Sequence, residues 1–317
     1  MTLLDCLDFT FGFCQEKRIG KGEDSWCYSF NEQAGLLGVF DGCGGSGAKT
    51  YQRLQSHTGA FLASRTVANA VMRWFEHACE GKEQAAAALE MQISKSLDTC
   101  SVQAGQEETR LRNKLRLEFP TTAAVWVVGM EGACINATSI SAGDSRTYLL
   151  DERGLMQVSV DDLRGEDAMS DLYNSAPMTN VISAKRPVKL NYSAYTLTRP
   201  GILLAATDGC FGYLRSPMEF EYLLLNTLMQ SKSVHQWHQS LSHEIEGIAG
   251  DDQTMAAAAF SYGSFSGMQQ ALLPRYHALQ RIVQGFDDEL QCRNQCWESY
   301  KAGYYRLAKG GAPEVER

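Results

Sequence analysis

Carboxylates stand at the ends of several apolar runs in this 317-residue chain. Asp41 follows residues 36–40 in the stretch GVFDGCGGSG, and Asp208 follows residues 202–207 in ILLAATDGC. Asp251 precedes a third apolar run in GDDQTMAAAAF. Short apolar runs bounded by glycine are typical of buried strands. If the strands share a sheet, their acidic ends could meet at one edge of it.

A single Asp-Gly pair is usually only a turn, but several together favour a shared function. Glu23 and Asp24 in KGEDSW and Asp144 in SAGDSRTYLL add further carboxylates beside predicted strands. Such charges would repel one another strongly unless divalent cations neutralised them. Oxygen donors without a histidine or cysteine set indicate Mg²⁺ or Mn²⁺.

The glycine-rich stretch GCGGSGAKT offers an alternative, because it almost spells the phosphate-binding loop of P-loop NTPases. That loop requires the lysine directly after the last glycine. Here Ala48 separates Gly47 from Lys49, so the lysine would leave the loop on the wrong side. The metal interpretation is therefore favoured over the P-loop.

Charge and composition limit the classes of partner. The formal net charge is −8, from 29 basic and 37 acidic residues, which disfavours nucleic acid. No apolar stretch reaches membrane-spanning length, and the N-terminus does not resemble a signal peptide. The ten cysteines are scattered and predict reduced thiols rather than a disulfide framework. We expect a cytoplasmic monomer that binds neither membrane nor nucleic acid.

Hydrophobic periodicity predicts blocks of helices between short strands, which indicates an α+β fold. The predicted helices cover residues 48–77, 83 towards 115, 217–230, 233–248, 269–285 and 287–309. The predicted strands after the first helices cover residues 122–128, 134–140, 145–150, 155–160, 194–198, 202–207 and 254–260.

The last 55 residues predict a separate helical appendage. We expect one domain over residues 1–262 and a helical C-terminal extension over 263–317. The extension carries a stripe of anchors that predicts packing on the domain: Trp297, Tyr300, Tyr304, Tyr305 and Leu307.

The order of the motifs resembles the metal-dependent protein phosphatase family (PPM, type 2C), in a divergent, bacterial-like form. GVFDGCGG resembles the family signature FGVFDGHGG, AGDSRTYL resembles GDSRAYL, and LLAATDGCFGYL resembles LILASDGLWD. FPTTAAVWVV, QVSVDD and GDDQTMAAAAF follow the family's GSTAVVVL, T-x-DH and DNxTxIVV segments. The resemblance covers about residues 8–262, in the family's order.

The resemblance implies a fold and a metal site. The fold would be a four-layer α-β-β-α sandwich, with two antiparallel sheets flanked by helix pairs. Two Mn²⁺ or Mg²⁺ ions would lie at one end, and a third ion is possible. Carried over by position, the metal-binding residues would be Glu23, Asp24, Asp41, Gly42, Asp208 and Asp251, with Asp41 bridging both ions.

The resemblance also implies a reaction. A water activated by the two metals would hydrolyse phosphoserine and phosphothreonine in a phosphoprotein, such as the product of a Ser/Thr kinase. The alternative is a metal-binding pseudo-phosphatase that acts as a regulatory or interaction module.

Four departures from the family pattern bear on that choice. Cys43 replaces a histidine implied to protonate the leaving group, and Ile19 replaces a phosphate-gripping arginine, for which Arg18 is the nearest substitute. Asp252 replaces an asparagine. The acid of the possible third metal site falls at Leu117, with Glu118 adjacent.

Two other segments carry acids that we expect to be structural. Asp144 and Arg146 could act in catalysis by proximity, but an internal salt bridge or support of the GDSR turn is favoured, because buried polar groups need partners. We expect Asp161 and Asp162 to form a solvated turn.

Overall fold

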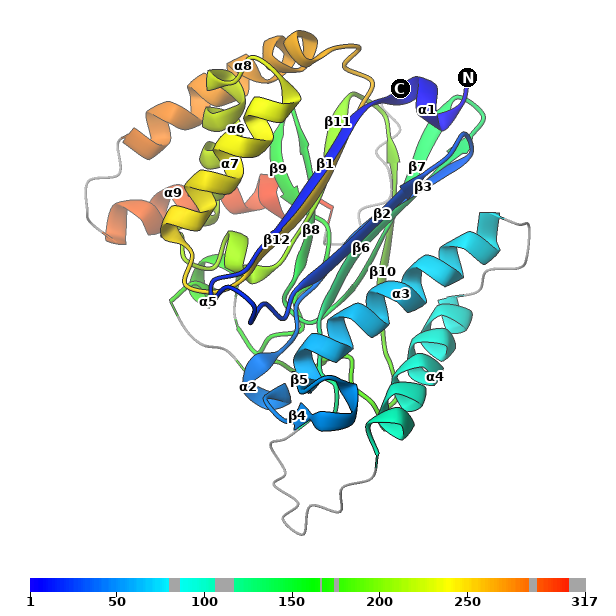
Figure 1. Cartoon of the computed structure of the whole chain (residues 1–317). Helices are drawn as coiled ribbons and strands as arrows, with labels where there is room; N and C mark the ends of the chain where they lie inside the picture. Colours follow the sequence, from blue (N-terminus) through cyan, green and yellow to red (C-terminus); the bar gives the residue numbers. More distant parts are fainter. Residues whose placement is uncertain (80–85, 106–116, 166, 174–176, 285–289, 308–317) are drawn as a thin grey trace.

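Two antiparallel sheets stack face to face in the computed structural model, which describes residues 1–79, 86–105, 117–165, 167–173, 177–284 and 290–307 (Figure 1). The first sheet has the order β1 (Leu7–Gln15), β12 (Gln253–Phe260), β11 (Gly201–Ala206), β8 (Arg146–Asp151) and β9 (Gly154–Gln157). The second has the order β10 (Asn191–Leu197), β7 (Cys134–Ala142), β6 (Ala123–Glu131), β3 (Ala34–Phe40) and β2 (Ser25–Phe30). A separate hairpin joins β4 (Thr50–Tyr51) to β5 (His57–Thr58).

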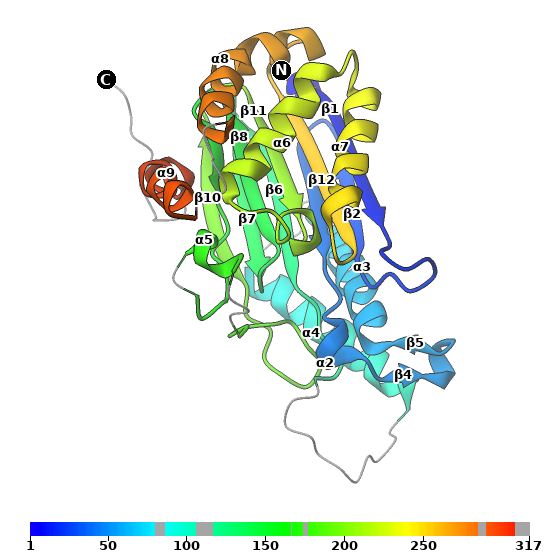
Figure 2. The same cartoon turned by 90° about the vertical axis from the view of Figure 1, so that its left-hand side faces the viewer.

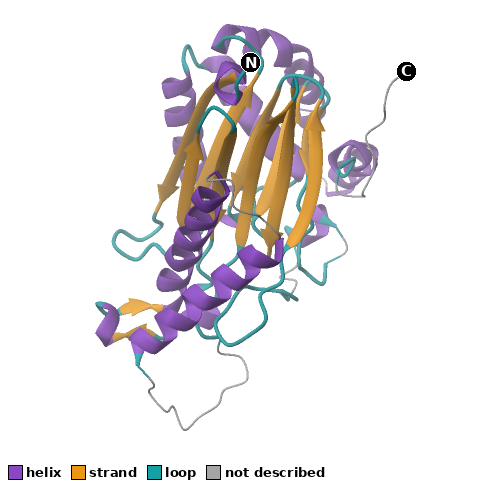
Figure 3. Cartoon of the chain, turned by 90° about the vertical axis from the view of Figure 1, so that its right-hand side faces the viewer, coloured by secondary structure: helices purple, strands orange, loops and turns teal. Residues whose placement is uncertain are grey.

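Helices cover both outer faces of the sandwich (Figure 3). The second sheet is covered by α3 (Gly59–Cys79) and α4 (Ala86–Ala104), and the first by α6 (Pro217–Gln230) and α7 (Val234–Ile248). The helix α8 (Phe265–Gln284) packs on α6, and α9 (Leu290–Tyr304) lies beside β9 (Figure 2). The short helical segments are α1 (Leu3–Cys6), α2 (Gly44–Gly47), η1 (Gln52–Leu54), α5 (Ala168–Asp171) and η2 (Asp208–Cys210).

Alternation along the central strands builds the core. In β12, Met255, Ala257 and Ala259 pack under the helices, whereas Ala256 and Ala258 face the second sheet. All five are buried, so each face of the strand is covered. The small alanines let the two sheets and the helical layer approach closely, and this sets the positions of the strand ends.

The predicted four-layer α-β-β-α sandwich is confirmed, and so are the seven predicted strands after residue 120 and the helices at 217–230 and 233–248. The first predicted helix was wrong at its start, because α3 begins at Gly59. Gln55 and Ser56 have φ of 58° and 61°, and the Thr58 hydroxyl accepts the N–H of Phe61 as an N-cap does. Residues 48–58 instead hold the hairpin.

The second predicted helix ends at Ala104, and its predicted continuation over 106–115 lies outside the described residues. The strands β1 and β2 were not predicted. Within the described part of the chain, no helix is both long and apolar enough to cross a bilayer. The division into a domain over 1–262 and an extension over 263–317 stays a prediction.

Candidate metal centre

Acidic side chains gather where β2 begins, β3 ends, β11 ends and β12 begins. In the paired registers Ser25 lies opposite Phe40, and Ala206 lies opposite Met255, so these strand tips share one end of the sandwich. The adjoining acids act on one another electrostatically, which indicates that they converge: Glu23, Asp24, Asp41, Asp208 and Asp251. We call these five side chains, with Asp144, the carboxylate cluster.

The backbone of Asp41 is fixed by two threonines at the start of β6. The Thr121 hydroxyl donates to the carbonyl oxygen of Asp41 over 2.6 Å, and the Thr122 N–H donates to the same oxygen over 2.9 Å. The Asp41 N–H in turn donates to the Thr122 hydroxyl over 3.2 Å. With its peptide groups satisfied by neutral partners, Asp41 presents its carboxylate to the cluster.

Glu23 is held by the N-terminal part of α3. The Thr58 hydroxyl donates to its carboxylate, and the hydroxyl of Ser64 donates to its carbonyl oxygen over 2.5 Å. The guanidinium of Arg65 donates to that same carbonyl over 3.3 Å. A Cβ on Gly44 would lie 2.1 Å from a carboxylate oxygen of Glu23, so this glycine leaves room for the acid.

Asp252 fixes the β1–β2 connection through hydrogen bonds to its backbone, in addition to bringing a negative charge close to the cluster. Its two carboxylate oxygens accept the N–H groups of Lys17 over 2.8 Å and Glu23 over 2.7 Å. The neighbouring Asp251 is exposed and keeps its carboxylate at the mouth of the cluster. Arg18 is exposed, and the Ile19 side chain beside it is 98% exposed. The connection therefore leaves its predicted phosphate-binding position open to solvent.

Asp144 belongs to the cluster, and the predicted pairing of its carboxylate with Arg146 was wrong, because Arg146 pairs with Asp161. Its Oδ1 atom is buried without a hydrogen-bond partner. Burial and the nearby charge of Asp208 raise the pKa of Asp144 to about 7. The sequence did carry a signal, because Asp144 precedes a strand just as Asp251 does.

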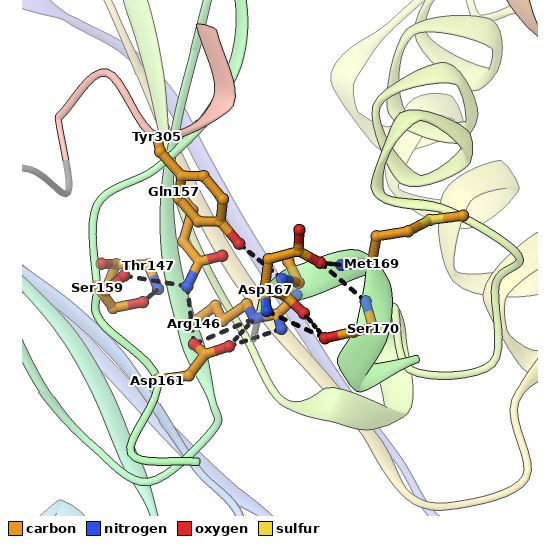
Figure 4. A network of polar contacts seen from close by, with 10 residues as sticks. Arg146, Thr147, Gln157, Ser159, Asp161, Asp167, Met169, Ser170 and Tyr305 are labelled. Carbon is orange, nitrogen blue, oxygen red and sulfur yellow. Dashed lines mark hydrogen bonds and ion pairs between the residues drawn. The ribbon is translucent and has the colours of Figure 1, made fainter. Parts of the chain in front are cut away.

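Arg146 does form the predicted internal salt bridge, but its partner is Asp161. The guanidinium donates to both oxygens of Asp161, with Nη2 at 2.6 Å from Oδ2 (Figure 4). The prediction of a solvated turn at Asp161 and Asp162 was therefore wrong. Asp162 accepts the N–H of Gly143 over 3.0 Å and returns its own N–H to the carbonyl of Gly143 over 2.9 Å. The two aspartates fix the chain on either side of Asp144.

Burial and mutual repulsion raise the pKa of the Asp24, Asp41 and Asp208 carboxyls. Burial is the main cause for Asp24, whose pKa is raised to about 7, and for Asp208, whose pKa is raised to about 6 with help from Asp24 and Asp251. The pKa of Asp41 is raised well above its usual value by burial and then by Asp24 and Asp208. Each carboxyl thus retains protons more tightly than in water.

Cys43 lies near three carboxylates of the cluster, Asp41, Asp144 and Asp208. Burial, followed by the charges of Asp41, Asp144 and Asp208, raises the pKa of its thiol well above the usual value. Its N–H donates to the carbonyl of Pro120 over 3.2 Å, which fixes the loop after Asp41. The residue thus stands beside the cluster, as its position in the motif predicts.

The donor set fits divalent cations that prefer oxygen. The cluster supplies carboxylates without histidine, and the buried Oδ1 of Asp144 is an acceptor that no protein group satisfies. Among the described residues, no group of three or more histidine, cysteine or acidic side chains has the spacing needed to hold a metal ion. Instead, Asp24 shares a hydrogen bond with Asp41 and accepts the Thr207 hydroxyl over 2.9 Å. Cation binding would replace that contact.

Two other predicted positions lie in different surroundings. Glu118 accepts hydrogen bonds from the hydroxyl of Ser101 over 2.5 Å and from the ammonium of Lys185 over 2.6 Å, so its carboxylate is engaged away from the cluster. Lys49 places its ammonium 4.9 Å from the centre of the Tyr51 ring. The two antiparallel sheets around it lack the parallel architecture of a P-loop enzyme.

Solved structures supply the comparison for this arrangement. The serine/threonine phosphatase PstP/Ppp of Mycobacterium tuberculosis matches with a TM-score of 0.53 and 18% identity, over 79% of this chain and 97% of that one. Stp1 from Staphylococcus aureus matches with a TM-score of 0.55 and 17% identity, over 80% and 97%. The chain has the fold of the PPM-type serine/threonine phosphatases.

Among the comparisons with known proteins, only those with solved structures give a match. No family model matches the sequence, and no curated protein matches it. A further structure with this fold, the PstP catalytic domain in complex with two manganese ions, matches with a TM-score of 0.51 and 16% identity, over 80% of this chain and 97% of that one. The solved chains are covered almost completely, whereas about a fifth of this chain remains unmatched.

Proposed function

We propose that the chain is a metal-dependent phosphatase of phosphoserine and phosphothreonine in proteins. The observation that carries the proposal is the convergence of buried carboxylates at one end of a PPM fold, with Asp41 at its centre. Mutual repulsion among buried carboxylates is a cost that a cation-binding function explains. The PstP complex with two manganese ions supports Mn²⁺ as the cofactor.

The residues would divide the work as follows. Asp41 would be shared by both ions, and the carbonyl of Gly42 would add an oxygen donor. Asp208 and Asp251 would complete one site, and Glu23 would serve the other. Asp24, hydrogen-bonded to Thr207, would orient water around them. Bound ions would supply an acidified water as nucleophile near neutral pH and charge neutralisation for the phosphoryl group. Asp144 is the carboxylate best placed, beside Asp208, for a possible third ion.

The phosphoryl group also needs a cation from the protein. We propose Arg18 for this role, because its side chain is exposed on the β1–β2 connection. Asp252 holds that connection through the backbone N–H groups of Lys17 and Glu23. Arg65 is bound to backbone carbonyls and serves to hold Glu23. The substrate would be a phosphoprotein that a Ser/Thr kinase has phosphorylated. The phosphatase would act on it as a monomer in the cytoplasm.

Two observations favour the second candidate, a metal-binding pseudo-phosphatase. Ile19 is almost fully exposed where the family has its arginine, and Cys43 occupies the histidine position. Such a protein would bind Mn²⁺ and a phosphoprotein without turnover.

One experiment separates the two. The purified chain is given an aryl phosphate and a phosphothreonine peptide, with Mn²⁺ and with chelator. Turnover that requires Mn²⁺, and that disappears in Asp208→Ala but persists in the control Lys49→Ala, supports the phosphatase. Calorimetric Mn²⁺ binding without turnover of the aryl phosphate selects the pseudo-phosphatase, because an aryl leaving group needs little protonation.

A further inference from the structure

The C-terminal helix α9 presents a buried aromatic face to the sandwich. Trp297 and Tyr304 are only 2% and 1% exposed, and their rings meet edge to face with centres 5.4 Å apart. The ring of Tyr304 also lies 6.3 Å from that of Tyr148 in β8. The helix is therefore docked on the strand that follows Asp144, not on a remote surface.

The same face of α9 and the residue after it complete the start of α5. The Trp297 indole N–H donates to Oδ2 of Asp167 over 2.9 Å. The Tyr305 hydroxyl accepts the N–H of Ala168 over 2.6 Å (Figure 4). The other oxygen of Asp167 accepts N–H groups of the first turn of α5. Helix N-termini need such partners. Tyr305 supplies one to the N–H of Ala168, and Trp297 holds the Asp167 carboxylate that caps the next two N–H groups.

Arg146 lies where these contacts meet. Its guanidinium sits 4.4 Å above the ring centre of Phe211, and it acts electrostatically on the hydroxyls of Tyr304 and Tyr305. Arg146 is 3% exposed, and its charge is balanced by Asp161. A buried ion pair needs fixed geometry to repay its desolvation. The aromatic side chains of α9 and Tyr305 form one wall of the pocket that encloses the Arg146–Asp161 ion pair.

The pocket bears directly on the cluster. Arg146 and Gly143 flank Asp144 in the GDSR turn, and they are held by the adjacent Asp161 and Asp162. A shift of this ion pair would move the turn from both sides and displace the carboxylate of Asp144.

We propose that α9 is a positioning element of the active site, which holds the GDSR turn and Asp144 in register through Trp297, Tyr304 and Tyr305. The inference rests on the proposed phosphatase function only in taking the cluster as the metal site. It adds that the C-terminal extension sets how tightly that site binds metal.

The test compares two variants that remove hydrogen-bonding groups from α9 and from Tyr305, the residue after it. The double variant Trp297→Phe with Tyr305→Phe removes the two hydrogen bonds to the start of α5 and keeps an aromatic ring at both positions. The matched control is Tyr300→Phe, which removes a hydrogen bond of 2.5 Å from the same helix to Glu221 in α6. Hydrogen exchange of residues 143–146 and 167–171 is measured in the full chain, followed by Mn²⁺ affinity by calorimetry.

The double variant should speed exchange in both segments by about tenfold, since a loss of cooperative contacts lowers the local opening free energy. It should weaken Mn²⁺ binding by about tenfold, as loss of supporting contacts behind metal ligands does. Tyr300→Phe should change neither. Faster exchange confined to 167–171, or equal effects in the control, would overturn the inference. A wild-type chain that neither binds Mn²⁺ nor hydrolyses the phosphate substrates would refute the proposed function. The hydrogen-exchange data would still decide whether α9 positions the GDSR turn.

Discussion

The two sides of the carboxylate cluster are supported by different chemistry. On the Asp41 side, hydroxyl and peptide groups of Thr121 and Thr122 hold the backbone, and Thr58 holds Glu23. On the Asp144 side, the turn is held by charged groups, namely Arg146 with Asp161 and the carboxylate of Asp162. The first set lies within the domain predicted from sequence, whereas the second extends to aromatic residues at the C-terminus.

That difference separates a fixed side of the site from an adjustable one. Short contacts from neutral groups near in space leave Asp41 few alternative positions. The ion pair of Arg146 depends on walls supplied by several elements, including Phe211 and Tyr304. We expect changes on the Asp41 side to affect the chemistry itself, and changes on the Asp144 side to affect metal affinity.

The largest effect is expected from Asp41→Asn. The substitution keeps the shape of the side chain and removes the charge that the proposed bridge requires, so Mn²⁺-dependent turnover of an aryl phosphate should fall by about a thousandfold. Circular dichroism should show an unchanged fold, because the backbone contacts to Thr121 and Thr122 remain. Retention of more than a tenth of the activity would remove Asp41 from the centre of the site.

A substitution between the two sides gives the next largest effect. Cys43→His restores a side chain whose pKa of about 6.5 suits proton donation to a leaving alkoxide. Turnover of a phosphothreonine peptide should rise by about tenfold to a hundredfold, whereas that of an aryl phosphate should change little.

The control for this prediction is Cys43→Ser, which should raise neither rate. If Cys43→Ser instead abolished peptide turnover selectively, the thiol would already be the proton donor, and the histidine would be no improvement on it.

Thr122→Val tests the link between the sides. The Thr122 hydroxyl shares a hydrogen bond of 2.6 Å with the Ser145 hydroxyl and also accepts the N–H of Asp41. Its loss should lower the free energy of unfolding by about 1–3 kcal/mol, because buried polar groups lose a partner. It should also raise the Mn²⁺ concentration for half-maximal activity by about tenfold.

The matched control is Thr147→Val, since Thr147 shares a buried 2.6 Å contact with the Ser139 hydroxyl rather than with a residue next to a cluster carboxylate. This variant should lose similar stability in urea unfolding and keep the same Mn²⁺ requirement. Equal Mn²⁺ requirements for both valine variants would show that Thr122 serves stability alone.

The sequence predicted the fixed side better than the adjustable one, for a physical reason. Asp41 and Asp208 each end an apolar strand, and the period-2 pattern places such residues at a strand tip. Asp161 and Asp162 follow β9 with no pattern that distinguishes a solvated turn from a buried clamp. Their role depends on Arg146, whose burial is set by segments distant in sequence. Local pattern cannot encode that contact.

The elements show the same division. The helix α6 has a serine cap at Ser216 and a proline at its first position, so its start could be predicted. The true start of α3 depends on Thr58 and on left-handed backbone at Gln55 and Ser56, which a helix-forming sequence conceals. The strand β1 was missed because its residues are half-buried at the edge of the sheet rather than alternating clearly.

The smallest effect expected is on thermal stability, and it involves both sides together. The pKa of Asp24 and Asp144 is about 7 and that of Asp208 about 6, all raised above the usual value near 3.8. The folded chain without metal therefore binds more protons than the unfolded chain between about pH 4 and 7, and its stability falls as pH rises through this range. With chelator present, the melting temperature should be lower at pH 8 than at pH 5 by about 5 °C.

Mn²⁺ should reverse this trend, because the ion replaces the protons and binds best when the carboxyls are ionised. The neutral variant Asp144→Asn should flatten the pH dependence of the metal-free chain, since it removes one repelling charge at pH 8. Calorimetric melting curves at the two pH values, with and without Mn²⁺, provide the measurement. A metal-free chain that becomes more stable from pH 5 to pH 8 would show that the carboxylates do not repel one another. The cluster would then lose the electrostatic reason for expecting a metal.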